Sequence, residues 1–151
     1  MSTSKRKLKV LFLCTGNSCR SQMAEGWARH LKGDVIEPYS AGVAPHGLDP
    51  RAVRVMREAG VDISDQRSKH VDELTDVDLD CVITVCDDAR ESCPVFPAPV
   101  KTLHRSFEDP PRLAEESDSE EEALGHYRRV RDEIRRMVES LPDALGEGEG
   151  A

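Results

Sequence analysis

The apolar run Val10–Leu13 and the eight residues after it constrain the fold more than any other stretch of this chain. Those residues are Cys14-Thr15-Gly16-Asn17-Ser18-Cys19-Arg20-Ser21. A β-favouring run that leads through a glycine turn into a helical pattern predicts a strand–loop–helix unit. Such a loop ends at a helix N-terminus, where backbone N–H groups and the helix dipole attract an oxyanion. We therefore expect residues 14–21, here called the anion loop, to bind an anion.

The anion loop carries a thiol at its start and a guanidinium near its end. An ordinary cysteine is only about 3% thiolate at pH 7, but a helix N-terminus or a nearby cation lowers a cysteine pKa to roughly 3.5–7.5. Cys14 is therefore expected to be a nucleophilic thiolate, and Arg20 is expected to hold the anion with its planar fork of donors. Gly16 permits the close backbone approach that a cradle needs, and Asn17 tolerates a left-handed backbone.

Length and composition predict one domain with an aliphatic core. The chain has 151 residues, of which 38% are hydrophobic and only 4% aromatic. We expect a single domain over 1–151, with its core at 6–141 and a flexible tail at 142–151. No apolar run approaches the ~20 residues of a membrane span, and the run after Lys9 is too short for a signal peptide. A cytoplasmic protein is therefore expected.

The net charge of −8 argues against nucleic acid and anionic membranes as partners. An anionic substrate would have to be attracted by local donors against this overall field. We expect no nucleic-acid partner, no membrane partner and a monomer.

Five cysteines occur, at positions 14, 19, 81, 86 and 93. In a reducing compartment an odd set indicates thiol chemistry or a metal rather than a disulfide scaffold. We interpret the set as thiol chemistry rather than a structural zinc site, and expect no metal and no cofactor. Cys19 and Cys81 are expected to pack as small core residues.

Strands alternate with helices along the chain. Strands are predicted at residues 7–14, 35–42, 81–85 and 100–103, and Pro38 places the second strand at a sheet edge. Helices are predicted after the anion loop, from Pro50 to the residue before Gly60 with Asp49 as cap, and after an acidic run at 115–122. For the helix from Pro50, Val53, Met56 and Ala59 are expected on the buried face. Ser119 and Glu122 fit a capping box before the last helix. A short helical turn is predicted at 71–74 and loops at 62–69 and 107–111.

This alternation predicts a three-layer α/β fold, with a four-stranded parallel sheet and helices on both faces. Ligands of such sheets bind at the carboxyl ends of the strands. Cys14 and Cys86 are both expected at that edge.

The C-x5-R loop followed by serine resembles the low-molecular-weight protein tyrosine phosphatase family. Asp109-Pro110 matches the position of that family's general acid, and the resemblance extends from Lys7 to about Leu141. Cys86 and Cys93, seven residues apart after the central strand, depart from the phosphatases. With the run from Cys14 to Glu25, they are similar to the thioredoxin-coupled arsenate reductases, which share the phosphatase fold and add a redox pair.

The resemblance implies reduction of arsenate to arsenite, with thioredoxin as reductant. Cys14 would attack arsenic, Cys86 would attack Cys14, and Cys93 would attack Cys86, while Arg20 binds the oxyanion and Asp109 supplies a proton. The implied oxyanion-binding residues are Thr15, Gly16, Asn17, Ser18, Cys19, Arg20 and Ser21. Because a helix would hold residues 86 and 93 about 10 Å apart, beyond the roughly 7 Å that a disulfide spans, we expect a mobile redox segment at 87–99.

Some members of this family hold an alkali cation through an Asn, a Glu, a Ser and an Asp. Asn17, Glu25 and Ser40 match three of these positions, but Lys69 occupies the fourth. We expect the Lys69 ammonium to take the place of the cation.

Other functions stay open. A phosphatase needs only Cys14, Arg20 and Asp109, although Pro111 and Arg112 stand where phosphotyrosine enzymes usually place aromatic residues. A sensor that binds an oxyanion or reports oxidation, and a phosphocarrier, are further alternatives. The histidines at 46, 70, 104 and 126 show no partner pattern and are expected at the surface.

Overall fold

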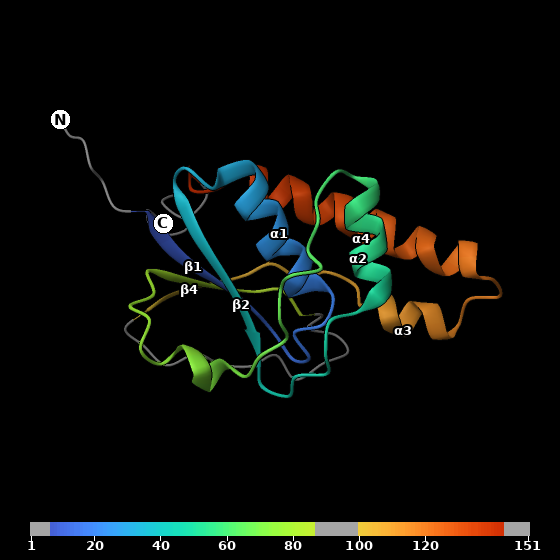
Figure 1. Cartoon of the computed structure of the whole chain (residues 1–151), viewed down its shortest axis with the longest axis horizontal. Coiled ribbons are helices and arrows are strands. Elements are labelled where there is room, and N and C mark those ends of the chain that lie inside the picture. Colours follow the sequence, from blue (N-terminus) through green and yellow to red (C-terminus); the bar gives the residue numbers. More distant parts are fainter. Residues whose placement is uncertain (1–6, 87–99, 144–151) are drawn as a thin grey trace.

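A parallel sheet forms the centre of the part of the chain that the structure describes. The computed structural model covers this part as residues 7–86 and 100–143. The strands are β1 (Leu8–Cys14), β2 (Ile36–Gly42), β3 (Cys81–Thr84) and β4 (Lys101–His104), in the order β2-β1-β3-β4 (Figure 1). All the pairings are parallel, so the carboxyl ends of the four strands meet at one edge of the sheet.

The redox segment predicted at 87–99, with Cys93, lies outside the described residues. So do residues 1–6 and the part of the predicted tail from 144 onward.

Helices cover the two faces of the sheet unequally. On one face, α1 (Arg20–Lys32) and α4 (Glu120–Glu139) pack together, and α2 (Pro50–Glu58) and α3 (Pro110–Glu115) pack on α4. The other face is covered by the short 3₁₀ helix η1 (Val71–Leu74) and the segment after it (Figure 1). None of the helices in the described ranges is long and apolar enough to cross a membrane. The predicted three-layer α/β fold is confirmed.

Strand β1 is buried on both faces, as expected for an inner strand of a parallel sheet. On the α-helical side, Val10 and Phe12 join a core that includes Trp27 of α1. On the η1 side, Leu11 and Leu13 join a second, smaller core. Both cores therefore hold the strand that leads into the anion loop.

The predicted cap of α2 is confirmed, and the capping box of α4 is half formed. Asp49 Oδ1 accepts from the backbone N–H two residues further on at 2.9 Å. Ser119 Oγ accepts from Glu122 N at 3.0 Å. The Glu122 carboxylate does not return this bond; it accepts instead from Asp118 N at 3.3 Å.

The structure corrects two expectations about helices. Helix α3 begins at Pro110, inside the loop predicted at 107–111. Proline is tolerated there because the first turn of a helix needs no partner for the N–H that proline lacks. Val53 and Ala59, expected on the buried face of α2, are only partly buried. The fully buried side chains of α2 are Ala52, Val55 and Met56.

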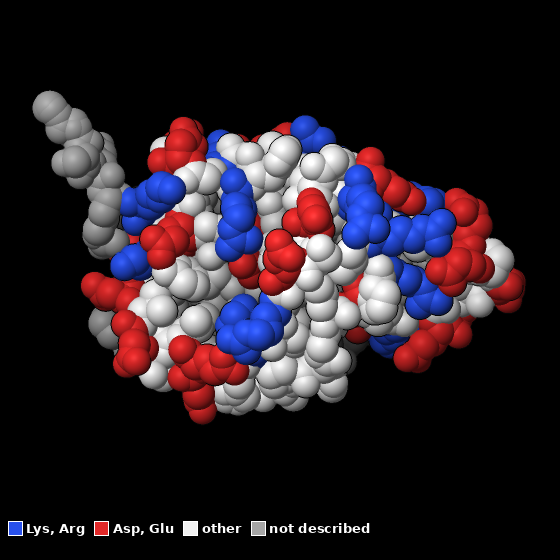
Figure 2. All heavy atoms as spheres, in the orientation of Figure 1, with Lys and Arg blue, Asp and Glu red and all other residues white. Residues whose placement is uncertain are grey.

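Charged side chains of both signs crowd the end of the molecule formed by α3 and α4 (Figure 2). The acidic run at 115–122 lies here at the surface. Two of its carboxylates form ion pairs, Glu120 with Arg51 at 2.9 Å and Glu121 with Arg128 at 2.6 Å. Exposed pairs of this kind add little to stability, so the run is a solvated surface that neighbouring arginines partly neutralise.

Candidate active site

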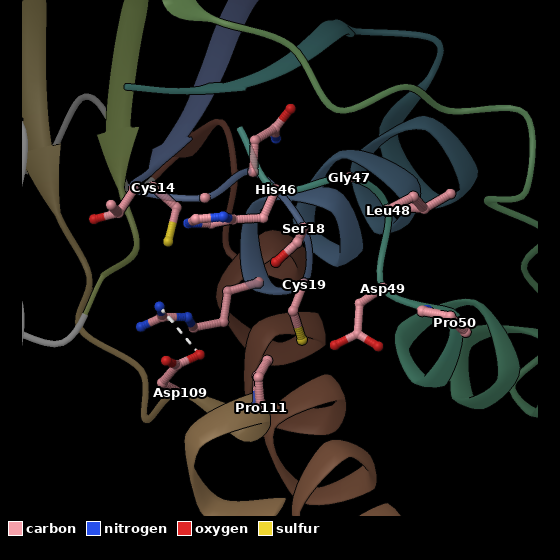
Figure 3. Close-up of a pocket in the computed structure, with 14 residues that line it drawn as sticks. Cys14, Ser18, Cys19, His46, Gly47, Leu48, Asp49, Pro50, Asp109 and Pro111 are labelled. Atoms are coloured by element: carbon pink, nitrogen blue, oxygen red, sulfur yellow. Dashed lines mark ion pairs between the residues drawn. The ribbon is translucent and has the colours of Figure 1, made fainter. Parts of the chain in front are cut away.

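The anion loop lies at the carboxyl edge of the sheet, between the end of β1 and the start of α1. It lines a cavity of about 370 Å³ (Figure 3). The rest of the lining comes from residues 46–50, which lead into α2, and from Asp109 and Pro111 at the start of α3. Residues that are far apart in the sequence thus meet at the edge where the fold was expected to bind its ligand.

A buried asparagine fixes the shape of the loop. Asn17 is fully buried, and its backbone has a positive φ of 47°, the left-handed conformation that Asn tolerates. Asn17 Nδ2 donates to Ser21 Oγ at 2.8 Å, and Asn17 Oδ1 accepts from Lys69 N at 2.8 Å. Gln22 Nε2 donates to the Asn17 carbonyl at 3.0 Å. These bonds hold the loop in shape, and Ser21 braces it from behind and is not part of the cavity lining.

Arg20 and Asp109, which both line the cavity, form the ion pair that the dashed line marks in Figure 3. Arg20 Nη2 lies 3.4 Å from Asp109 Oδ1, and Arg20 Nη1 donates to the Phe107 carbonyl at 3.0 Å. The arginine side chain is only 4% exposed, whereas that of Asp109 is 26% exposed. The N-cap position of α3 therefore directs a carboxylate toward a guanidinium that two contacts hold in place.

The cavity contains two thiols in different surroundings. Cys14 and Cys19 both line the cavity, and neither forms a disulfide bond. Burial, followed by the charge of Asp49, raises the pKa of the Cys19 thiol well above its ordinary value, although the positive charge of Arg20 opposes the shift. Cys19 is therefore a neutral thiol, and it belongs to the core on the α-helical side.

Cys86 lies after the strand next to the one that carries Cys14. Leu13 pairs with Thr84, and Val85 N donates to the Leu13 carbonyl at 3.0 Å. Cys86 is fully buried and takes part in a disulfide bond. It therefore lies at the same edge of the sheet as Cys14, whereas Cys81 begins β3 at the opposite edge and is free.

Lys69 forms hydrogen bonds through both its backbone and its side chain, and the backbone bond reaches the anion loop. Its N–H donates to Asn17, and Lys69 Nζ donates to the carbonyls of Ser40 and Arg67, both at 2.9 Å. Ser40 Oγ in turn donates to Glu25 Oε1 at 2.5 Å. Burial lowers the pKa of Lys69, and the charge of Glu25 opposes that shift. Asn17 and Ser40, two of the residues matched to a cation site, are thus hydrogen-bonded to Lys69 directly. Glu25, the third, is connected to it through Ser40.

Within 7–86 and 100–143, no group of three or more His, Cys, Asp or Glu residues is arranged to hold a metal ion.

Two residues of the cavity wall were missed as site residues. His46 was expected at the surface; it is exposed, but it also lines the cavity. Asp49 was expected only as a helix cap, yet it lines the cavity as well, and its Oδ2 accepts from Tyr127 OH at 2.6 Å. Both follow β2, and the carboxyl ends of parallel strands share one edge. Applied to β2, the same rule points to these residues.

Comparison with known proteins agrees with this geometry. The family model described as "Low molecular weight phosphotyrosine protein phosphatase" matches residues 9–149. An arsenate reductase of Bacillus licheniformis is 50% identical over 137 residues, which cover 91% of this chain and 96% of that protein.

Solved structures give the same result. "An arsenate reductase in the phosphate binding state" superposes with a TM-score of 0.73 and 34% identity, covering 89% of this chain and 95% of that one. A thioredoxin-dependent arsenate reductase of Corynebacterium glutamicum superposes with a TM-score of 0.60 and 26% identity, covering 91% of this chain and 64% of that one.

The fold and the anion loop are those of a phosphatase-like α/β enzyme, and the chain belongs to the low molecular weight phosphotyrosine protein phosphatase family. Within that family, its similarity is to the arsenate reductases, as the resemblance in the sequence implied.

Proposed function

We propose that this chain reduces arsenate to arsenite through Cys14, Cys86 and Cys93, and that thioredoxin returns it to the reduced state. The observation that carries the proposal is that the anion loop with Cys14 and the buried Cys86 follow neighbouring strands. The names of the relatives support arsenate as the substrate.

The first step is attack by the Cys14 thiolate on arsenic. Arsenate is a tetrahedral oxyanion, so the N–H groups of the anion loop and the guanidinium of Arg20 hold its oxygens. A sulfur–arsenic bond forms, and one oxygen leaves as water after it receives protons. Asp109, which faces Arg20 in the same cavity, is the proton donor.

The second step transfers two electrons to arsenic. The Cys86 thiolate attacks the sulfur of Cys14, the sulfur–arsenic bond breaks, and its electron pair stays on arsenic, which leaves as arsenite. A Cys14–Cys86 disulfide remains. Cys93 then attacks Cys86, which frees Cys14 as a thiolate and leaves a Cys86–Cys93 disulfide.

An external dithiol must reduce the last disulfide. Thioredoxin is the proposed donor, because the Corynebacterium glutamicum neighbour is named as thioredoxin-dependent. Cys86 is disulfide-bonded, whereas Cys14, Cys19 and Cys81 are not, and this is compatible with the oxidised end state.

The test is arsenate-dependent NADPH consumption with thioredoxin and thioredoxin reductase. Turnover by the parent should fall at least a hundredfold in Cys86→Ser and in Cys93→Ser, because each change removes one attacking sulfur. Cys81→Ala is the matched control, since Cys81 is a buried free cysteine at the other end of β3. Full turnover in either serine variant would overturn the relay.

Phosphate-ester hydrolysis is the second candidate, because Cys14, Arg20 and Asp109 meet in one cavity. The described lining holds no Phe, Tyr or Trp to stack on a phosphotyrosine ring, and Pro111 lies where one would help. If the parent hydrolyses an aryl phosphate but shows no arsenate turnover, and neither serine variant changes this hydrolysis, the chain is a phosphatase.

A further inference from the structure

The backbone of residues 44–49, which include His46, forms three hydrogen bonds with the backbone of the anion loop. Ala44 N donates to the Thr15 carbonyl and His46 N donates to the Gly16 carbonyl, both at 2.9 Å. Asp49 N donates to the carbonyl of Ser18 at 3.0 Å. The backbone of residue 46 is therefore fixed against the loop, although its side chain is exposed.

The imidazole of His46 lies directly on Gly16. A Cβ atom at position 16 would lie 2.5 Å from His46 Cδ2, so only glycine leaves room for the ring. Both residues line the cavity, and Figure 3 shows the His46 side chain reaching over the loop on the side of Cys14. The ring thus forms part of the wall around the place where an anion would bind.

The other side-chain donors of the described lining lie in the anion loop itself and include the hydroxyls of Thr15 and Ser18 and the guanidinium of Arg20. Arg20 is ion-paired with Asp109, and Asp49 contributes a second carboxylate to the wall. A tetrahedral oxyanion that rests on the loop presents at least one oxygen to the cavity mouth. The His46 ring, at the rim of the same loop, is placed to donate to that oxygen.

We propose that His46 is the outer substrate-binding residue of this site, and that a ring N–H donates to an oxygen of the tetrahedral oxyanion held on the anion loop. This proposal rests on the proposed function only for the identity of the oxyanion. Inorganic phosphate has the same shape and charge and serves as the probe.

The test measures phosphate binding by the full chain as protection of Cys14 against alkylation, followed by mass spectrometry of its peptide. A hydrogen bond to a charged group contributes about 1.5–3 kcal/mol, so His46→Ala should raise the phosphate Kd at least tenfold. His46→Gln, which keeps an N–H donor, should restore the Kd to within about threefold of the parent. His126→Ala, which removes a histidine of α4 outside the cavity lining, is the matched control.

The kinetic counterpart is the KM for arsenate. It should rise in His46→Ala by the same factor as the phosphate Kd, with kcat within about twofold of the parent. A phosphate Kd that is unchanged in His46→Ala, or as weak in His46→Gln as in His46→Ala, overturns the proposal. If the parent fails to reduce arsenate while His46→Ala still weakens phosphate binding, the proposed function falls and His46 keeps its role.

Discussion

At the scale of single residues, the surroundings of each thiol decide its chemistry more than its distance from the substrate does. Cys14 and Cys19 line one cavity, but Cys19 is buried beside the Asp49 carboxylate. A carboxylate opposes the formation of a second negative charge nearby. The site thus places two sulfurs near the anion and holds one of them protonated.

This difference predicts the order in which the two cysteines of the cavity react. A raised pKa means a smaller thiolate fraction at a given pH, so Cys19 should alkylate at least tenfold more slowly than Cys14 with iodoacetamide at about pH 7.5. The rate at Cys19 should rise only as the pH approaches its raised pKa. Mass spectrometry of the separate peptides measures both rates.

Cys81 is the internal control for this experiment. Burial raises its pKa to about 11, and it lies at the opposite edge of the sheet, so it should also stay unmodified. Equal rates at Cys14 and Cys19 would contradict the assignment of Cys19 as a neutral thiol.

At the scale of secondary-structure elements, Asp49 joins α2, α4 and the cavity wall. One oxygen caps α2 and the other accepts from Tyr127 OH of α4. Burial and the bond to Asp49 raise the pKa of Tyr127 above its ordinary range, so the hydroxyl keeps its proton and donates. A single carboxylate therefore fixes where α2 begins relative to α4.

Substitutions at the two ends of this contact should be coupled. Asp49→Ala removes a cap worth about 0.5–2 kcal/mol and a hydrogen bond to a charged group worth about 1.5–3 kcal/mol. Asp49→Asn keeps the cap, and Tyr127→Phe removes only the hydroxyl, so each should destabilise the chain less than Asp49→Ala. Urea unfolding measures the three free energies of unfolding.

The Asp49→Ala, Tyr127→Phe double variant should lose less stability than the two single changes added together, because they share one interaction. Strict additivity would show that the hydroxyl and the carboxylate contribute separately.

The elements themselves were largely predictable from the sequence, because their signals are local. The apolar run before Cys14 predicts a strand and Asp49 predicts a helix cap, each from a few neighbouring residues, and the structure contains both. The start of α3 was missed because Asp109-Pro110 is equally typical of a turn, and packing against α4 decides for a helix.

The site was only partly predictable. The anion loop is continuous in sequence, so its residues could be found from the motif alone. The contact of His46 with Gly16 joins two loops thirty residues apart, and no sequence pattern indicates that these two residues touch. Cys93 stays a prediction, as do the roles assigned to the loop residues.

At the scale of the whole molecule, the two cores share one sheet. Phe12 and Leu11 are adjacent in β1 and fully buried, but they point into different cores. Phe12→Ala should cost about 3–5 kcal/mol and Leu11→Ala about 2–5 kcal/mol. Because the same strand holds both cores, each change should move the urea midpoint and leave the steepness of the transition unchanged.

Hydrogen exchange of the hydrogen-bonded amides of Val77 and Leu79, measured at each urea concentration, follows the core on the η1 side in this experiment. Trp27 fluorescence is the second signal and follows the core on the α-helical side. The two signals should change together in both variants. If Leu11→Ala shifts the first signal to lower urea but not the second, the two sides of the sheet unfold independently.

The outer strand β2 also limits what the sheet can become. Leu8 N donates to the Val35 carbonyl, and alternate residues of a strand turn their N–H groups to opposite sides, so position 38 faces the border of the sheet that points away from β1. Proline there has no N–H to offer to a further strand. A second molecule that tried to add itself as a fifth strand would leave one of its carbonyls without a donor. Pro38 thus hinders the edge-to-edge association of two molecules through strand β2.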